Sequence, residues 1–377
     1  MSILEASNER RDHHKVRYAV VGAGWIAQED FMPGVKHTGN SVMTALVTGD
    51  TVKAGEVAER YGIEHVTGYD GYDELLQSGA IDAVYIALPN TMHRDYTVRA
   101  LEAGIHVLCE KPMAPTEEDC LAMIEASERT GAKLMIAYRL HFEEATVEAI
   151  ELLRSGKIGD PRLFHSMHAQ QVDPDNHRTE GELWAGPLPD MGPYPINAAR
   201  QLFADEPEEA FALKTRTSEH RFDEVPESVS AILRFPGDRI AQFTVSYGIN
   251  SFNQYRVGGT EGDLEVTPGY AWDKQLTHRL TVGMETSEKK FPKVDQFGGE
   301  TKYFSDCILD DLQPEPDGYE GLADVRVIKA IERSIESGRA EPIQPSKRDL
   351  RPRRERVEKL RAVKPGKMVH AEPAGKS

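Results

Sequence analysis

The segment Gly22–Ala27, with the sequence GAGWIA, is the first stretch whose residue types point to chemistry. Its first glycine permits a tight turn, its second lets the main chain approach a pyrophosphate, and Ala27 allows a helix to pack closely on a strand. The free N–H groups at the start of that helix would face the phosphates. Because a β-branched run precedes the segment and a helical pattern follows it, we expect a dinucleotide-binding turn.

Two later segments also follow short apolar runs, at the positions where loops of a parallel sheet hold ligands. Ala87–His93 (ALPNTMH) combines a proline turn with polar side chains, and Asn90 could equally cap a helix. Lys111 stands between Glu110 and Pro112, an unusual setting for an ordinary surface lysine. In a partly desolvated cleft beside a nicotinamide, we expect the pKa of Lys111 to fall and its charge to steer a proton.

The choice of dinucleotide depends on the residues that follow the second strand. NAD enzymes usually place an Asp or Glu there, which binds the ribose 2′-hydroxyl. In this chain neutral Thr48 ends the strand, Asp50 follows it, and Lys53 begins the next helix. Lys53 could meet the 2′-phosphate of NADP, whereas Asp50 could accept the ribose hydroxyl of NAD. Both cofactors stay open at this point, and we favour NADP.

Three histidines and an aspartate, at His165, His168, Asp173 and His177, resemble metal ligands in their residue types. In a strand, a spacing of three residues puts His165 and His168 on opposite faces. Zinc needs ligands that converge, so we expect no metal site here. One or more of these histidines could instead line a substrate pocket.

The elements that must position these residues alternate in type up to residue 137. Continuous apolar runs separated by amphipathic helices are typical of a parallel sheet covered on both faces. The expected strands are Val16–Val21, Val42–Val47, Ala83–Leu88, His106–Cys109 and Leu134–Ala137. The expected helices are Val52–Tyr61, Met92–Ala103 and Thr116–Arg129, the last with Thr116 as its cap. We therefore predict an α/β fold that begins with a Rossmann dinucleotide-binding domain.

After residue 137 the pattern changes. In Val229–Phe235 and Ala241–Tyr247 apolar residues alternate with more polar ones, and residues 236–238 (PGD) between them fit a hairpin loop. Further helices are expected over Glu143–Arg154, Glu300–Leu309 and Tyr319–Ser337. This half of the chain predicts an antiparallel sheet with two different faces.

Composition narrows the class of protein. The chain has 377 residues and a net charge of −17, which works against binding to nucleic acid or to an anionic membrane. Three scattered cysteines indicate reduced thiols, and no apolar run of ~18 residues could span a membrane. We expect a cytoplasmic enzyme with a small-molecule substrate. The C-terminal stretch is basic but carries interleaved glutamates and no aromatics, which favours a solvated or inter-subunit arm.

Taken together, these motifs resemble the glucose–fructose oxidoreductase / inositol dehydrogenase / MocA-type family. The resemblance runs from about Val16 to Arg339 and is closest to the glucose–fructose oxidoreductase branch. Besides the glycine turn, it rests on Pro89-Asn90 with His93, Glu110-Lys111-Pro112, residues 137–141 (AYRLH), Asp190 with Tyr194, and residues 257–264 (VGGTEGDL). The branch shows a tyrosine where many relatives place a histidine four residues after the aspartate.

The resemblance implies Lys111, Asp190 and Tyr194 as catalytic residues. A tyrosine, with an ordinary pKa of ~10, needs a nearby cation to accept a hydroxyl proton near neutrality, and Lys111 could supply it. Proline flanks Tyr194 on both sides, but the first turn of a helix over Gly192–Phe203 tolerates it. The candidate cofactor-binding residues are Gly22, Gly24, Trp25, Ile26, Thr48, Lys53, Leu88, Pro89, Asn90, His93, Glu110, Lys111 and Arg139.

The resemblance also implies an organisation and an activity. We expect a flexible N-terminus (1–15), a Rossmann NAD(P)-binding domain (16–138), a substrate-binding and oligomerisation α/β domain with a large, open, mostly antiparallel sheet (139–345), and a basic C-terminal arm (346–377). The predicted enzyme is an NAD(P)-dependent oxidoreductase for a sugar or polyol, a homodimer or homotetramer through its second sheet. One alternative is a cyclitol, keto-sugar or dihydrodiol dehydrogenase. The other is a catalytically silent dinucleotide-sensing regulator.

Overall fold

The N-terminal part of the chain forms a six-stranded parallel sheet in the order β3-β2-β1-β4-β5-β6, as expected of a Rossmann domain. The computed structural model describes residues 15–346 and 351–375, so the predicted N-terminal segment 1–15 lies almost wholly outside the described residues. The strands are β1 (Val16–Val21), β2 (Ser41–Val47), β3 (His65–Thr67), β4 (Ala83–Ile86), β5 (His106–Glu110) and β6 (Leu134–Ala137). The expected strands are confirmed, and the short β3 is an addition.

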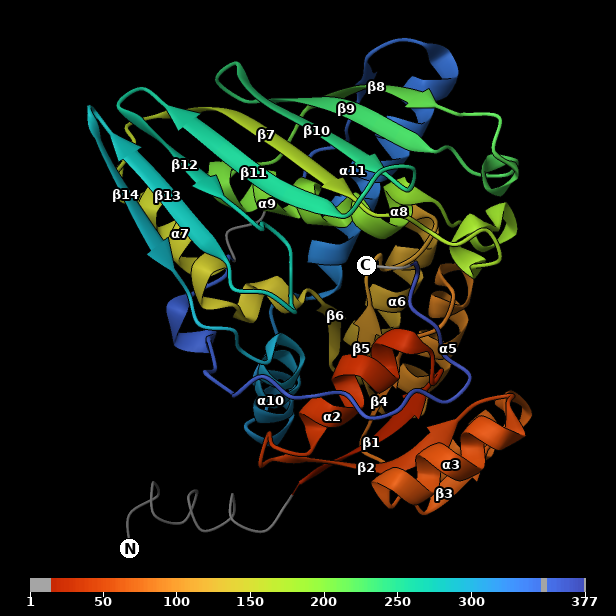
Figure 1. Ribbon diagram of the computed structural model, residues 1–377. Helices are drawn as coiled ribbons and strands as arrows, with labels where there is room; N and C mark the ends of the chain where they lie inside the picture. Colours follow the sequence, from red (N-terminus) through yellow and green to blue (C-terminus); the bar gives the residue numbers. More distant parts are fainter. Residues whose placement is uncertain (1–14, 347–350, 376–377) are drawn as a thin grey trace, which may run out of the picture.

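Helices cover both faces of this sheet, because its strands are apolar on both sides (Figure 1). Beyond the helix that follows β1, they are α3 (Thr51–Tyr61), α4 (Tyr72–Gln77), α5 (His93–Glu102) and α6 (Glu117–Thr130). The helix after β1 starts at Trp25 and runs through a π-helical stretch, η1 (Ala27–Phe31), into α2 (Met32–Val35). Thr116 caps α6 as predicted, its side-chain oxygen accepting a hydrogen bond from the N–H of Asp119.

The second sheet has nine strands in the order β14-β13-β12-β11-β7-β10-β9-β8-β15. All neighbouring strands are antiparallel except β7 and β10, which confirms the predicted mostly antiparallel sheet. The strands are β7 (Pro161–Ala169), β8 (Glu209–Thr215), β9 (Ser228–Phe235), β10 (Arg239–Ser246), β11 (Phe252–Gly259), β12 (Gly262–Val266), β13 (Thr277–Val282), β14 (Glu285–Lys290) and β15 (Glu341–Pro342). The loop at residues 236–238 joins β9 to β10 as a hairpin.

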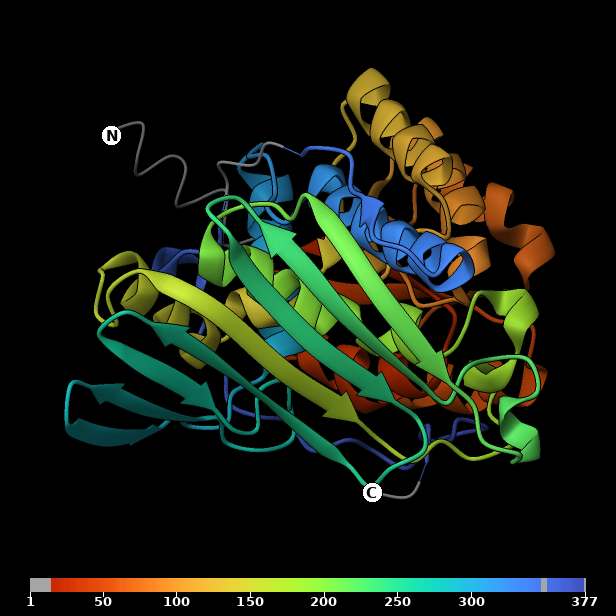
Figure 2. The same ribbon diagram turned by 90° about the horizontal axis from the view of Figure 1, so that it is seen from above.

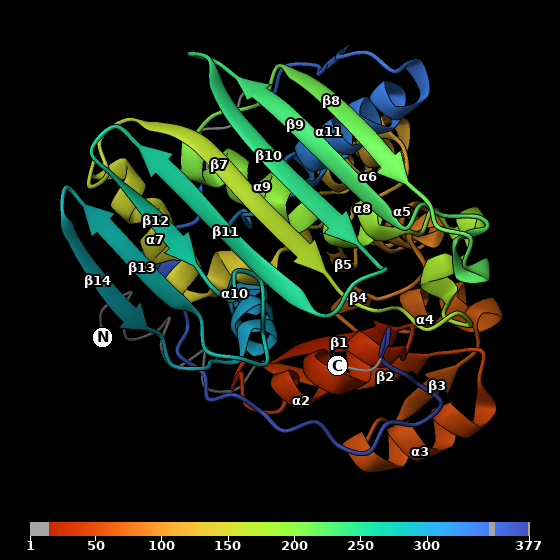
Figure 3. The same ribbon diagram turned by 45° about the horizontal axis from the view of Figure 1, so that its top comes forward.

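One face of the second sheet packs on helices and the other is open. The helices of this half are α7 (Glu144–Arg154), α8 (Pro187–Met191), α9 (Pro193–Phe203), α10 (Gln296–Leu309) and α11 (Gly318–Ser337). Figures 2 and 3 show α7, α9 and α11 behind the sheet and no described helix in front of it. The alternation along β9, with every second residue buried from Val229 to Phe235, follows from this one-sided packing.

Two C-terminal helices tie the sheets together. α10 packs on α2 and on strands β1 and β2 of the first sheet, while α11 contacts both α6 and β8. A buried polar network supports this junction: Arg200 donates to Glu320 at 2.8 Å, and the hydroxyl of Tyr138 donates to Asp324 at 2.8 Å. Buried polar contacts therefore hold α9, α11 and the segment after β6 together.

Short 3₁₀ turns and the C-terminal arm complete the chain. The turns are η2 (Tyr69–Gly71), η3 (Asn90–Met92), η4 (Arg139–Phe142), η5 (His177–Thr179), η6 (Gly181–Leu183), η7 (His220–Phe222) and η8 (Arg354–Arg356). Residues 351–375 contact their own chain, which differs from the expectation of a solvated arm. Arg351 is buried beside Glu206, and Arg356 pairs with Glu315. Within the described residues, every helix is too short or too polar to cross a bilayer.

Candidate active site

A cavity of about 480 Å³ opens between the two sheets, at the carboxyl ends of β1, β4 and β5. That is the edge at which open α/β sheets bind ligands, and the size is typical of ligand pockets. The predicted residues all line this cavity: Gly22, Gly24, Trp25, Ile26, Thr48, Lys53, Leu88, Pro89, Asn90, His93, Glu110, Lys111, Arg139, Asp190 and Tyr194. The structure thus brings them together, and their individual roles stay predictions.

The glycine turn forms a cradle that fits a pyrophosphate. Gly22 has a φ of +89°, and a Cβ there would lie 2.5 Å from the carbonyl oxygen of Ala87. Only glycine meets both conditions. A Cβ on Gly24 would instead enter open space. The main chain at Gly24 therefore faces the cavity without obstruction, directly before the helix that starts at Trp25.

The residues after β2 separate the two cofactor hypotheses. Thr48 and Lys53 line the cavity, and Asp50 does not. The Oδ1 atom of Asp50 accepts hydrogen bonds from the N–H groups of Val52 (3.0 Å) and Lys53 (2.9 Å), so this carboxylate caps α3. The main-chain hydrogen bond from Lys53 lowers the pKa of Asp50, and a contact with His370 adds to this effect. Asp50 is thus engaged in capping rather than directed at the cavity.

His93 and Glu110 support the loops around the cavity. The buried His93 ring has Nε2 2.9 Å from the carbonyl of Leu88 and Nδ1 3.0 Å from that of Pro112. It therefore links the loops after β4 and β5, and burial lowers its pKa. Glu110 accepts a hydrogen bond of 2.6 Å from the hydroxyl of Tyr85, and burial raises the pKa of Glu110.

Lys111 reaches across the cleft to Asp190 in α8, the short helix directly before α9. Its Nζ donates to the main-chain carbonyl of Asp190 at 2.8 Å and lies 3.3 Å from Oδ1 of the same residue. Burial works to lower the pKa of Lys111, but Tyr194, Asp190 and Glu110 together raise it above its ordinary value. The lowered pKa expected beside a cationic nicotinamide is therefore not present in this structure, where the ammonium has a carboxylate as its neighbour.

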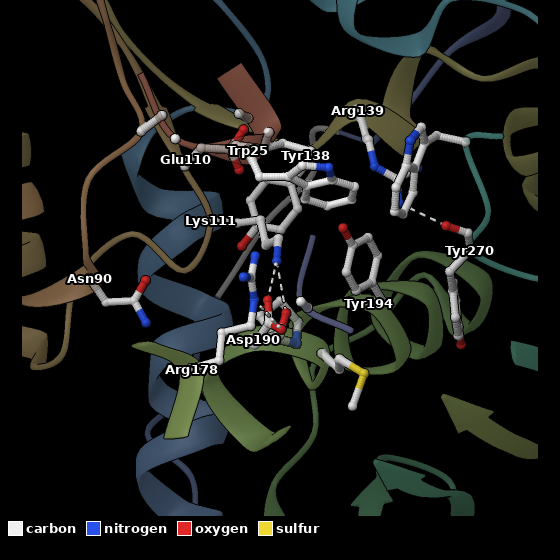
Figure 4. Close-up of a pocket in the computed structure, with 18 of the residues that line it drawn as sticks. Trp25, Asn90, Glu110, Lys111, Tyr138, Arg139, Arg178, Asp190, Tyr194 and Tyr270 are labelled. Atoms are coloured by element: carbon white, nitrogen blue, oxygen red, sulfur yellow. Dashed lines mark hydrogen bonds and ion pairs between the residues drawn. The ribbon is translucent and has the colours of Figure 1, made fainter. Parts of the chain in front are cut away.

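The carboxylate of Asp190 contacts two cations, Lys111 and Arg178, and one hydroxyl, that of Tyr247. Arg178 lies on the other side of the carboxylate, with its Nε 3.3 Å from Oδ2, and the hydroxyl of Tyr247 donates to Oδ2 at 2.8 Å. Although burial raises the pKa of Asp190, Lys111, Arg178 and Tyr247 outweigh it and hold this pKa well below its usual range. Figure 4 shows Lys111 and Arg178 converging on Asp190.

Tyr194 lies in the first turn of α9, beside the Lys111 side chain (Figure 4). The helix starts at Pro193, so the flanking prolines are accommodated as predicted. The Nζ of Lys111 lies 4.8 Å from the ring centroid, and the Arg139 guanidinium carbon lies 5.0 Å from it. Two cations thus face the ring of the proposed base.

Several cavity residues escaped the sequence analysis. Arg178 comes from η5, Tyr247 follows β10, and Tyr270 and Trp272 belong to the loop between β12 and β13. None carries a local motif, because each is brought to the site by a strand or turn of the second half. Arg139 stacks on Trp272, with 5.1 Å between the guanidinium carbon and the ring.

The sequence analysis expected that some of these histidines could line a substrate pocket. His168 and His177 do line the cavity, while His165 is exposed. Because His168 is buried near Lys111 and Arg139, its pKa falls to about 3, so its imidazole is neutral. Within residues 15–346 and 351–375, no cluster of His, Cys, Asp and Glu side chains has the arrangement of a metal site.

Two family models match the chain. The first, described as "Oxidoreductase family, NAD-binding Rossmann fold", matches residues 16–138. The second, the "GFO/IDH/MocA C-terminal domain", matches residues 117–265. Together they cover the glycine turn, Lys111, Asp190 and Tyr194.

Named relatives match over most of the chain. A D-xylose 1-dehydrogenase [NADP(+)] of Haloarcula marismortui is 37% identical over 334 residues, which are 85% of this chain and 91% of that protein. A dTDP-3,4-didehydro-2,6-dideoxy-alpha-D-glucose 3-reductase of Streptomyces violaceoruber is 30% identical, over 78% and 85% of the two chains. The crystal structure of an aldose-aldose oxidoreductase from Caulobacter crescentus, complexed with glycerol, has a TM-score of 0.83. The two sequences are 37% identical, and the match covers 88% of this chain and 100% of the Caulobacter chain.

Proposed function

The chain belongs to the GFO/IDH/MocA family of NAD-binding oxidoreductases, and on that premise we propose that it is an NADP-dependent dehydrogenase of aldopyranoses. The reaction is the transfer of a hydride from the carbon that carries the anomeric hydroxyl. One observation carries the proposal: Lys111, Asp190 and Tyr194 meet in the same cavity as the Gly22–Ala27 cradle.

Each of the three residues has a distinct role in this proposal. Tyr194 accepts the proton of the substrate hydroxyl, and a nicotinamide bound in the cavity would supply the acceptor for the hydride of the same carbon. Lys111 donates a hydrogen bond to the substrate oxygen, and its ammonium lies over the ring of Tyr194. Asp190 holds Lys111 in place through Oδ1. Because the low pKa of Asp190 keeps it charged, it positions Lys111 and takes no proton itself.

The cofactor follows from the residues at the adenosine end. Thr48 and Lys53 line the cavity there, and an ammonium with a hydroxyl suits a phosphate ester. Asp50, which would bind the ribose hydroxyl of NAD, is occupied as a helix cap. The Haloarcula relative named as an NADP(+) enzyme supports the same choice.

The substrate class follows from the opposite wall. The rings of Tyr194 and Tyr270 lie 5.7 Å apart, and apolar ring faces suit the C–H face of a sugar. Arg178 and the neutral His168 add polar atoms around them. The relatives named a xylose dehydrogenase and an aldose-aldose oxidoreductase fit an aldopyranose better than a cyclitol or a dihydrodiol.

Cofactor reduction tests the function directly. The purified protein is mixed with NADP or NAD and with single aldoses, keto-sugars, cyclitols and a dihydrodiol, and absorbance at 340 nm is followed. We expect reduction of NADP with at least one aldopyranose. If only cyclitols or dihydrodiols react, the proposed substrate class is wrong. If NADP binds and no substrate in the panel reacts, the proposed function itself fails.

We propose further that the protein is a homo-oligomer through the open face of the second sheet. That face exposes a series of large apolar side chains: Leu163, Phe211, Leu213, Ile232, Ile240 and Phe252. An apolar surface that spans several strands is rare on a monomer. Light scattering at micromolar concentration should give a multiple of the 42.1 kDa chain mass, and a value of one chain mass would contradict the proposal.

The three free, buried cysteines fit a cytoplasmic enzyme.

A further inference from the structure

The end of the C-terminal arm crosses the cofactor cleft and is held on both sides of it. On the first side, Gln28 exchanges two hydrogen bonds of 2.9 Å with the main chain of Val369. On the second, the carbonyl of Ala374 accepts from the N–H of Asp173 at 2.8 Å. Figure 1 shows this segment crossing the Rossmann half and ending between the two sheets. We call residues 367–375 the strap.

The strap is built into the cofactor half of the molecule. Val369 is 4% exposed and packs in the same core as Ala23 and Ala27 of the glycine turn. The Nε2 atom of Gln28 also donates to the carbonyl of Ala23 at 2.9 Å, so one side chain joins the strap to the cradle. Gln28 therefore links the strap directly to the phosphate-binding turn.

The midpoint of the strap lies at the adenosine end of the cavity. His370, Ala371 and Glu372 line the cavity together with Thr48 and Lys53. The Nδ1 atom of His370 lies 2.7 Å from Oδ2 of Asp50. Since Oδ1 of Asp50 caps α3, both oxygens of this carboxylate are engaged. Asp50 thus holds the imidazole of His370, a residue that lines the cavity.

We propose that the strap is part of the cofactor site and that His370 is a specificity residue for the adenosine 2′-phosphate of NADP. In the imidazolium form both ring nitrogens donate: Nδ1 to Asp50 and Nε2 to the phosphate. Lys53 and Thr48 form the other side of the same phosphate site. This inference rests on the proposed use of NADP.

Binding measurements on one substitution test the specificity role. Dissociation constants of NADP and NAD are measured by isothermal titration calorimetry for the wild type, His370→Ala and His220→Ala. His220 is an exposed histidine that also pairs with an aspartate but does not line the cavity, and it serves as the matched control. We expect His370→Ala to weaken NADP roughly tenfold, because a hydrogen bond to a charged phosphate is lost, and to leave NAD within about twofold.

A truncation tests the strap separately. A chain that ends at residue 365 keeps Arg351, Arg356 and the pairing of Arg361 with Val294, and its thermal unfolding serves as a control for folding. We expect it to bind both cofactors more weakly and to release them faster. Tighter binding after truncation would mean that the strap occupies the cofactor site and inhibits, which overturns the proposal.

The outcomes distinguish this inference from the function on which it rests. If the wild type binds NAD better than NADP, the proposed cofactor is wrong. If it prefers NADP, and His370→Ala weakens both cofactors equally or neither, only the role of His370 is contradicted. His370→Gln provides a second check, because glutamine keeps a hydrogen-bond donor but not the positive charge. It should fall between the wild type and His370→Ala for NADP.

Discussion

The two walls of the cavity are built in different ways. The cofactor wall consists of loops that directly follow strands of one parallel sheet, with the glycine turn after β1 and Lys111 after β5. The substrate wall is assembled from α8, α9, the end of β10 and the loop before β13. On the first wall a short motif and its strand define a position. On the second, each side chain depends on the packing of distant segments.

The difference extends to what each wall contributes. The cofactor wall offers main-chain groups and a single turn whose shape only glycine permits. The substrate wall offers charged and aromatic side chains whose states depend on one another, as the low pKa of Asp190 depends on Lys111 and Arg178. Lys111 follows β5 but reaches Asp190 on the second wall and acts with it. Apart from Lys111, substitutions on the first wall should therefore change binding, and those on the second should change turnover.

The largest expected effect is on the cofactor wall. Gly24→Asp should abolish binding of both dinucleotides, because a carboxylate would occupy the open space above the turn and repel the pyrophosphate. Gly24→Ala adds only a Cβ to that open space and is the matched control, with the fold intact. Unchanged affinity of a folded Gly24→Asp variant in calorimetry would remove the cofactor assignment.

On the substrate wall, Tyr194→Phe should lower kcat by ~10²–10⁴-fold with cofactor affinity unchanged, since the ring stays and the proton acceptor is lost. Lys111→Ala should be at least as damaging. The two losses should not add in the double variant, because the residues act as a unit. Tyr319→Phe, which removes an exposed hydroxyl on α11 bound to Glu128, is the control. Near-normal turnover of Tyr194→Phe would exclude Tyr194 as the base, and a histidine of the His165–His177 segment, of which His168 and His177 line the cavity, would become the next candidate.

A smaller effect is expected at Lys53, where it would sharpen the comparison within the cofactor wall. Lys53→Ala should weaken NADP by roughly ten- to a hundredfold and NAD much less, because a charged contact to the 2′-phosphate is lost. Dissociation constants for both cofactors provide the measurement. Equal weakening of the two, or none, would show that Lys53 is an ordinary surface lysine and would reopen the role of Asp50 in NAD binding.

The same contrast explains how far the sequence could predict the structure. The parallel sheet, the glycine cradle and the loops after β4 and β5 were predictable, because each combines a local pattern with a strand. The three-residue β3 was missed because it carries no apolar run. The raised pKa of Lys111 depends on Tyr194 and on Asp190, the latter 79 residues away, and Asp50 meets His370 across 320 residues. Such pairs leave no periodic or local signal in one sequence.

The smallest expected effect concerns stability and is specific to the substrate wall. Asp190→Asn removes the charge between Lys111 and Arg178, and should lower the free energy of unfolding at pH 7 by about 1–3 kcal/mol. The pKa of Asp190 is lower in the folded protein than its ordinary ~3.9, so this stabilisation is present above pH ~4 and is lost as the pH falls below it. Urea unfolding of wild type and variant at pH 7 and pH 3 should therefore give a difference in unfolding free energy that shrinks at the lower pH.

The control is Asp160→Asn, at an exposed pair with Arg162, which should change stability little at either pH. An equal loss for Asp190→Asn at both pH values would mean that the shape of Asp190, rather than its charge, stabilises this wall.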